Sequence, residues 1–487
     1  MPRNLLFYLA LLLLFGAGIY GILRFGARLE SPGPSAGQTE AAPPAAPSSP
    51  SAEGKSPAGG FARGLFENVR HPLSRLLLQV LVIVAAAKLL GSLFAKIRQP
   101  PVIGEMIAGI LLGPSLLGLV APGVQTFLFP ADSLGALQLL SQVGVILFMF
   151  VVGIELDLQH LRQKADAAVL VSHASIVVPF FLGVSGALLV YRSLAPAGIP
   201  FNAFALFLGV ALSITAFPVL ARILEDRGMS KTSLGSTAIA CAAVDDVTAW
   251  CLLAVVVALV RADGLGGSLL TILLAVLFIA VMLFAVRPWA GRVLGVGGQG
   301  RSRGPGLLAG ILLFVFASAL FTEVIGIHAL FGAFLAGVAM PPEAGLRQFL
   351  RERLETFSSV FLLPLFFAFT GLRTEIGLLD DWRSWLVCAG IIAVAIAGKL
   401  GGSMLAARWT GMGWRDSVAL GVLMNTRGLV ELIVLNLGYD LGILSPRIFA
   451  MMVVMALVTT FMTGPLLNLL DAVRERAPVM PGRSRLI

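Results

Sequence analysis

Charge is scarce in this chain: Asp, Glu, Lys and Arg make up 13% of its 487 residues, whereas apolar residues make up 57%. Soluble domains average roughly 25% charged residues. This shortage excludes a soluble globular protein and is typical of a polytopic membrane protein. The basic residues lie singly or in pairs between apolar runs, so the formal net charge of +9 does not indicate a nucleic-acid partner.

Cysteine is scarce as well, and Cys241, Cys251 and Cys388 all fall inside apolar segments. Without a CxxC pair or zinc-type Cys/His spacing, neither a disulfide framework nor a structural metal is indicated. The glycine-rich string at 295–300 neither follows a strand nor opens a helix, which favours a linker over a phosphate loop. No other nucleotide or catalytic motif is present, so we expect no enzymatic activity and no cofactor.

Long apolar runs dominate the rest of the chain. Residues 1–25 combine a basic start with an apolar stretch, and they are either a signal helix or a signal anchor; their length favours the anchor. Residues 26–72 are rich in Pro, Ala and Ser and predict a flexible tether. About thirteen apolar segments follow within 73–470, one of them at 326–341, before a short tail at 471–487. The predicted fold is therefore an all-α, polytopic membrane protein with about thirteen core transmembrane helices and an N-terminal hydrophobic helix.

Lys and Arg are concentrated in alternate loops and at the C-terminus. The positive-inside rule makes that side cytoplasmic. We therefore expect a multi-pass protein of the cell membrane, with its tether outside and its C-terminus in the cytoplasm.

The chain also resembles itself. Three apolar motifs recur in the same order: 107–114 as 335–342, 147–158 as 365–376, and 208–219 as 420–431. An odd number of predicted crossings separates the copies, so they run in opposite senses. Inverted repeats are typical of transporters, whose substrate site lies at the repeat interface near the membrane midplane.

Matching positions of the two repeats hold helices that we expect to be interrupted, at 213–218 and 424–429. Pro218 removes a backbone donor, and Gly428 weakens the second helix. Irregular backbone at membrane depth is tolerated only beside a cavity or inside protein, where it offers carbonyls and half-helix ends to ions.

Two adjacent aspartates, Asp245 and Asp246, lie inside an otherwise uncharged run at 236–260. Carboxylates at membrane depth need a proton, a metal ion or a basic side chain as a partner. Lys399 is one candidate, with Gly398, Gly401 and Gly402 permitting close helix approach; a snorkelling lysine is the alternative. Adjacent helical residues point about 100° apart, so we expect one aspartate to pair with Lys399 and the other to face the unwound backbone.

Other charged residues occur in the apolar segments. Arg427 and Glu431 are four residues apart and predict a buried ion pair, for which a structural role is favoured. Glu105 and Glu155 are secondary candidates for the ion-binding site.

The segments at 211–250, 104–114 (GEMIAGILLGP) and 397–402 (AGKLGG) resemble the monovalent cation:proton antiporter superfamily, most closely its second family. That family includes sodium/proton antiporters, glutathione-gated potassium efflux antiporters and plant cation/proton exchangers. The resemblance covers 73–470 and implies a homodimer whose core domain rocks against a dimerisation domain. It also implies that Asp246 binds the cation or proton, that Asp245 pairs with Lys399, and that Thr215 lies beside the site. The chain departs from the potassium-efflux branch by lacking a nucleotide-binding domain after its last helix, which puts nucleotide or glutathione gating in doubt.

The leading hypothesis is secondary active antiport of sodium or potassium against protons by alternating access, with both ions competing for Asp245 and Asp246. If Lys399 also exchanges a proton, transport would be electrogenic. Sodium-coupled symport of an organic anion is one alternative, which the paired carboxylates disfavour; a non-transporting membrane sensor is another. Residue spacing does not distinguish sodium from potassium.

Overall fold

The computed structural model of the chain describes residues 2–32, 68, 71–155, 165–230, 232–261, 265–295, 305–341 and 343–476. Within these ranges the secondary structure is helical, without strands. Twelve helices there are long and apolar enough to cross a membrane, or thirteen if one bent pair is counted as a span. The chain is thus an all-α, multi-pass membrane protein. Most of the predicted tether, most of the glycine-rich string and the end of the tail lie outside the described residues.

The first half of the chain contains α1 (Pro2–Gly26), α3 (Pro72–Lys96), α4 (Pro101–Leu112), α5 (Leu117–Val120), α6 (Pro122–Leu128), α7 (Leu134–Glu155), α9 (Ala165–Leu194), α10 (Phe201–Ser213), α11 (Phe217–Asp226) and α12 (Ser233–Arg261). The second half contains α13 (Leu265–Ala280), α14 (Arg287–Gly295), α15 (Pro305–Val324), α16 (Ala329–Val338), α17 (Ala344–Leu350), α18 (Leu363–Leu372), α19 (Trp382–Ile396), α20 (Gly402–Trp409), α21 (Trp414–Met424), α22 (Leu429–Asp440) and α23 (Pro446–Arg476). Short π-helical stretches join some neighbours, among them Ala397–Gly401 between α19 and α20.

Each of the thirteen predicted segments contains a helix, but the segment at 326–341 is shorter than expected. Its helix, α16, has ten residues, too few to span a membrane alone. The helix begins only after His328, whose positive φ of 121° breaks the preceding chain.

The contacts between helices divide them into two bodies. We call the first the core body; it contains α9 to α12 and α19 to α23. We call the second the scaffold body; it contains α3, α4, α7, α13, α15, α16 and α18, with Phe278 of α13 stacked on Phe321 of α15. The bodies meet most extensively where α12 contacts α13, and further contacts join α22 to α18 and α23 to α4.

Paired glycines in the scaffold body confirm the inverted repeat. Helix α4 packs on α18 through Gly109 and Gly371, and α7 packs on α16 through Gly153 and Gly337. A Cβ added at Gly371 would lie 2.8 Å from the carbonyl carbon of Gly109, and one at Gly153 would lie 3.0 Å from the Cα of Gly337. Gly109 and Gly337 are equivalent in the first repeated motif, and Gly153 and Gly371 are equivalent in the second. Each motif therefore packs against the other motif from the opposite repeat.

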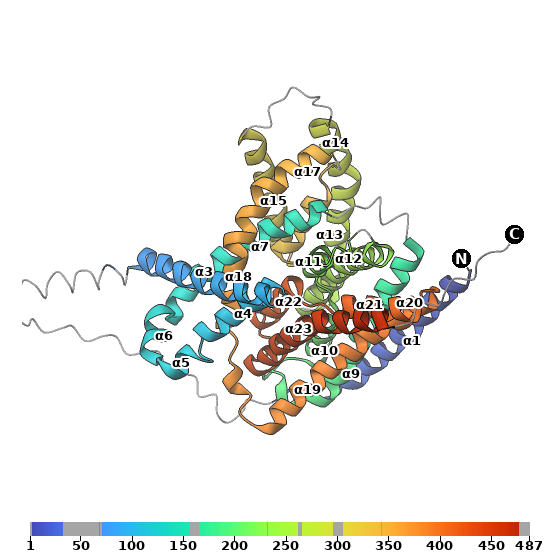
Figure 1. Cartoon of the computed structure of the whole chain (residues 1–487), viewed down its shortest axis with the longest axis horizontal. Helices are drawn as coiled ribbons and strands as arrows, with labels where there is room; N and C mark the ends of the chain where they lie inside the picture. The colour runs from blue at the N-terminus through green and yellow to red at the C-terminus, as the bar shows by residue number, and fades with distance from the viewer. Residues whose placement is uncertain are drawn as a thin grey trace, which may run out of the picture.

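Helix α1 packs along α9 of the core body, on the other side of the molecule from α3 (Figure 1). Phe15 makes an edge contact with Phe181 at 5.1 Å between ring centroids, and Phe7 stacks on Trp409 at 4.4 Å. These contacts hold α1 against the outside of α9 and α20, and no residue in its apolar window is buried. That α1 is an anchor rather than a cleaved signal stays a prediction.

We predict that α1 remains attached in the mature protein, because its aromatic side chains interlock with α9 and α20 and each aromatic pair contributes about 0.5–1.5 kcal/mol beyond area burial. Intact-mass spectrometry of protein purified from membranes should give the mass of the full chain. A mass lacking the first 25 or so residues would overturn this prediction.

Candidate ion-binding site

The two interrupted helices meet inside the core body. The first breaks between α10 and α11, where Ile214 and Ala216 are extended; the second breaks between α21 and α22 with a bend of 42°. Backbone Ala216 N–H donates to Thr426 O at 3.0 Å and joins the two breaks. The unwinding expected from Pro218 and Gly428 is confirmed.

Each break contains a residue whose side chain contacts the carbonyl end of a half-helix in the other repeat. Arg427, from the second break, donates to three carbonyls at the end of α10: Ala211 (3.2 Å), Leu212 (2.6 Å) and Ile214 (2.8 Å). Thr215 is the equivalent residue of the first break, and its hydroxyl lies 3.1 Å from Met424 O at the end of α21. Helix ends leave carbonyls without intrahelical partners, which is costly where water is absent. Arg427 therefore stabilises the first break in the membrane interior. Thr215 has a single hydroxyl proton, which either Met424 O or Asp245 Oδ2, 2.6 Å away, can accept.

The predicted ion pair between Arg427 and Glu431 is confirmed, with 3.5 Å between Nη1 and Oε2 and both side chains fully buried. The hydrogen bonds of Arg427 go to backbone carbonyls, which supports the structural role favoured for it. Neither carboxylate oxygen of Glu431 has a hydrogen-bond partner among the described residues. Glu431 therefore balances the arginine by charge alone.

Asp245, on α12, is fully buried and surrounded by donors. Its Oδ2 accepts from Lys399 Nζ at 2.7 Å, from Thr215 at 2.6 Å and from Ser175 at 3.0 Å, and its Oδ1 accepts from Ser172 at 2.6 Å. The predicted pairing of Asp245 with Lys399 is confirmed. The lysine is fully buried, so the snorkelling alternative is wrong.

Lys399 also connects the aspartate to a broken helix, because its ammonium donates to Ser213 O at the end of α10. The glycines beside it act as expected in part. A Cβ at Gly398 would lie 2.8 Å from Pro179 Cα, and one at Gly402 would lie 3.0 Å from Ala174 O, so both glycines let α9 approach. Gly401 has no such neighbour within 4 Å, and its predicted role in packing is wrong.

Asp246 is buried, and neither of its carboxylate oxygens has a hydrogen-bond partner among the described residues. The expected pairing of one aspartate with Lys399 is confirmed, and that Asp246 faces the unwound backbone stays a prediction. Asp245 itself also contacts the first break, because Lys399 and Thr215 converge on the same oxygen and a carboxylate oxygen can accept more than one hydrogen bond. Asp246 is left as the acceptor that still lacks donors.

Ser172 and Ser175 are site residues that the sequence reasoning missed. They lie three residues apart on α9, so both hydroxyls face Asp245 from one side of that helix. The available signal was two hydroxyls at helical spacing in an apolar segment, which is weak because Ser is common in membrane helices.

The two secondary candidates lie in the scaffold body, apart from the aspartate pair. Glu105 on α4 is buried with Lys88 Nζ at 3.9 Å, and Glu155 at the end of α7 has Arg351 Nε at 3.7 Å. The described interactions do not connect either glutamate to Asp245 or Asp246.

The atoms around the aspartates that could coordinate a cation are hydroxyl, carboxylate and backbone oxygens. No group of three or more His, Cys, Asp or Glu that could hold a metal ion occurs among the described residues. Oxygen donors suit hard cations, whereas sites for softer transition metals use His and Cys.

Comparison with known proteins extends this picture. Residues 81–470 match the family described as sodium/hydrogen exchanger, transmembrane. The chain is 48% identical over 397 residues to the Na(+)/H(+) antiporter NhaS4 of Synechocystis sp., covering 81% of this chain and 97% of that protein. It is 41% identical over 417 residues to Cation/H(+) antiporter 17 of Arabidopsis thaliana, covering 84% of this chain and 50% of that protein.

A third relative is K(+)/H(+) antiporter 1 of Saccharomyces cerevisiae, 35% identical over 430 residues, covering 86% of this chain and 49% of that protein. The chain thus spans nearly all of the Synechocystis protein and about half of the plant and yeast proteins. Among solved structures, the sodium proton antiporter MjNhaP1 from Methanocaldococcus jannaschii shares the fold, with a TM-score of 0.57 and 16% identity over 82% of this chain and 98% of that one. The extent of the family match and the identity to NhaS4 show that this chain belongs to the sodium/hydrogen exchanger family.

Proposed function

We propose that this protein is a secondary active antiporter that exchanges sodium or potassium for protons by alternating access. The observation that carries the proposal is Asp246: a buried carboxylate without hydrogen-bond donors, beside the Asp245–Lys399 pair, where two broken helices cross. The relatives named as Na(+)/H(+) and K(+)/H(+) antiporters support it.

In this proposal, Asp246 is the residue at which cation and proton compete. A buried ionised carboxylate without a partner is costly, and a bound proton or monovalent cation removes that cost by neutralising it. Asp245 can coordinate the cation through a carboxylate oxygen when Lys399 releases it. The Thr215 hydroxyl donates a hydrogen bond to that same oxygen, Oδ2. The site needs no cofactor and no catalytic residue, since the only covalent bonds that form and break are those to the transferred protons.

The division into two bodies supports alternating access. Asp245, Asp246, Lys399 and both broken helices belong to the core body, so the site moves as one unit against the scaffold body. A neutralised site can cross the low-dielectric barrier, whereas an empty charged site is penalised. Only loaded states therefore change sides, and this couples the two ion fluxes.

We also propose a homodimer formed through the scaffold body, with the C-terminus in the cytoplasm. Helix α13 exposes an apolar row that suits either lipid or a second copy of the chain, made of Leu270, Leu273, Val276 and Leu277. The family resemblance implies the dimer, and the loop charges imply the orientation.

Asp246→Asn should abolish cation-driven proton flux, because a neutral amide has no negative charge for which a proton and a cation could compete. The measurement is dye-reported pH change in proteoliposomes challenged in turn with sodium, potassium, lithium and rubidium, which also gives the cation selectivity. Asp132→Asn is the matched control, since that carboxylate is 76% exposed on the scaffold body. Robust flux from Asp246→Asn would contradict the assignment of the site.

Lys399→Ala should remove the dependence of transport on membrane potential, because the ammonium can no longer exchange a proton as Asp245 releases it. Flux is measured in proteoliposomes with and without an imposed potassium diffusion potential. Lys88→Ala, beside Glu105 in the scaffold body, serves as the control. Unchanged voltage sensitivity in Lys399→Ala would refute the electrogenic part of the mechanism.

Arg427→Ala should lower the free energy of unfolding by about 3–5 kcal/mol, because it leaves Glu431 and the α10 carbonyls buried without their partner. Thr215→Val should cost about 1 kcal/mol, as it removes a single hydroxyl donor. Arg447→Ala, which breaks a partly exposed pair with Asp380, should cost about 0–1 kcal/mol. Unfolding of the purified variants in one detergent gives the ranking, and equal losses for Arg427→Ala and Arg447→Ala would disprove the capping role.

A further inference from the structure

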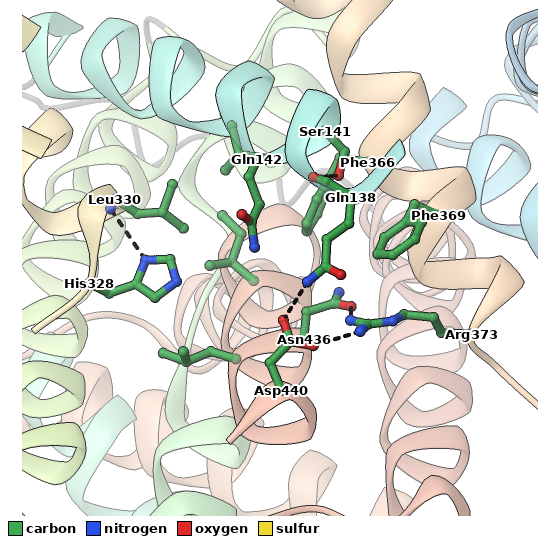
Figure 2. Close-up of a pocket in the computed structure, with 13 residues that line it drawn as sticks. Gln138, Ser141, Gln142, His328, Leu330, Phe366, Phe369, Arg373, Asn436 and Asp440 are labelled. Atoms are coloured by element: carbon green, nitrogen blue, oxygen red, sulfur yellow. Dashed lines mark hydrogen bonds and ion pairs between the residues drawn. The ribbon is translucent and has the colours of Figure 1, made fainter. Parts of the chain in front are cut away.

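A small cavity of about 30 Å³ opens at the end of the bundle where α18 and α22 end and α7 begins (Figure 2). This volume holds about two water molecules. The lining comes from both bodies: α22 of the core body, and α7, α18 and the start of α16 from the scaffold body.

The cavity follows one face of α22. Ile433, Asn436, Leu437 and Asp440 line it, and their spacing of three and four places them on one side of the helix. Helix α22 begins at Leu429, directly after the break at 425–428. The lined face therefore runs from the surface of the bundle toward the broken helices that hold the ion-binding site.

Hydrogen bonds across this cavity join the two bodies. Arg373 at the end of α18 donates to Asp440 Oδ1 at 2.6 Å and to Asn436 Oδ1 at 3.1 Å. Gln138 on α7 donates to Asp440 Oδ2 at 3.1 Å, and Asn436 donates to Thr370 Oγ1 at 2.8 Å. Figure 2 shows Gln138 and Arg373 converging on Asp440 and Asn436. Every one of these bonds has one end on α22 and the other on the scaffold body.

The central ion pair is more buried than an ordinary surface pair. The side chains of Arg373 and Asp440 are 17% and 28% exposed. The guanidinium lies over two aromatic rings, 4.8 Å from the centroid of Phe369 and 5.0 Å from that of Tyr439. Such stacking adds a cation–π contribution to the charge-assisted hydrogen bonds.

The position of this pair is unusual in the described part of the chain. Two pairs lie within the core body, Lys399–Asp245 and Arg427–Glu431, and Arg447–Asp380 joins α23 to the loop that connects α18 with α19. The pairs within the scaffold body and its connections are Arg75–Asp132, Lys88–Glu105, Arg351–Glu155 and Arg351–Glu355. Among ion pairs with both residues described, Arg373–Asp440 is the one that bridges the bodies.

We propose that Gln138, Thr370, Arg373, Asn436 and Asp440 form a latch that holds the two bodies closed at this end of the bundle. Movement of α22 away from α7 and α18 breaks every bond of the latch together. Its strength then sets the fraction of molecules whose ion site is open to that side. The proposal rests on the alternating-access function above, because a latch between rigidly fixed bodies would regulate nothing.

The test measures opening rather than transport. Val145 lines the cavity and is 1% exposed, so a cysteine there reacts only when the cavity opens. Val145→Cys is placed in a Cys251→Ala background, and protein in nanodiscs is treated with a water-soluble maleimide that reaches both faces. The rate is corrected for labelling of the same protein without the reporter.

Asp440→Asn and Arg373→Gln should each raise the labelling rate about tenfold, the size expected for loss of a charge-assisted hydrogen bond. Exchanging the two charges, Arg373→Asp with Asp440→Arg, should restore much of the protection. Asp132→Asn, which breaks a pair inside the scaffold body and its connections, should label at the starting rate. Wild-type labelling rates in both single latch variants would overturn the latch.

Two further variants separate the latch from the proposed function and from misfolding. Asp246→Asn should keep the starting labelling rate while losing antiport; if it keeps antiport, the ion-site assignment fails although the latch variants still label faster. If Asp440→Asn does not elute as a single species, Asn436→Ala, which keeps the ion pair, should still raise the labelling rate by at least about threefold, because it removes the two hydrogen bonds of that amide to Arg373 and Thr370. No increase in that variant would also overturn the latch.

Discussion

Backbone carbonyls cannot be left unpaired in the membrane interior, and this constraint organises the centre of the protein. Two helices are broken there, and each break creates a half-helix end. Arg427 and Lys399 supply donors to the end of α10, and Thr215 reaches the end of α21. The same Lys399 and Thr215 hold Asp245. The same two side chains, Lys399 and Thr215, therefore contribute both to the hydrogen bonding of the backbone carbonyls at the breaks and to the charge state of the site.

Much of this arrangement could be predicted from the sequence, because burial in lipid makes each exception conspicuous. The aspartate pair, Lys399 and Arg427 stand out as charges in apolar runs, and Pro218 and Gly428 mark positions where a helix cannot continue. The repeated motifs gave the inverted topology, which the exchanged glycine pairs confirm. The family match accords with the predicted superfamily.

The remainder depended on distances that spacing does not contain. The sequence does not indicate that Thr215 contacts Asp245 rather than Asp246, because this depends on how α12 is rotated relative to the two breaks. Ser172 and Ser175 resemble any other small polar residues of a membrane helix until α9 is placed beside α12. Likewise, Arg373 and Asp440 are ordinary helix-end charges in the sequence, and only packing brings them together between two bodies.

The exchange of glycine partners has a consequence for biosynthesis. Gly109 of α4 closes against Gly371 of α18, and Gly153 of α7 closes against Gly337 of α16, so neither early helix can complete its packing until the far half of the chain has been made. Contacts of such long sequence separation form slowly and late. During translation, α4 and α7 must therefore wait in the bilayer with their glycine faces open, where assembly is most sensitive to chaperones and to truncation of the nascent chain.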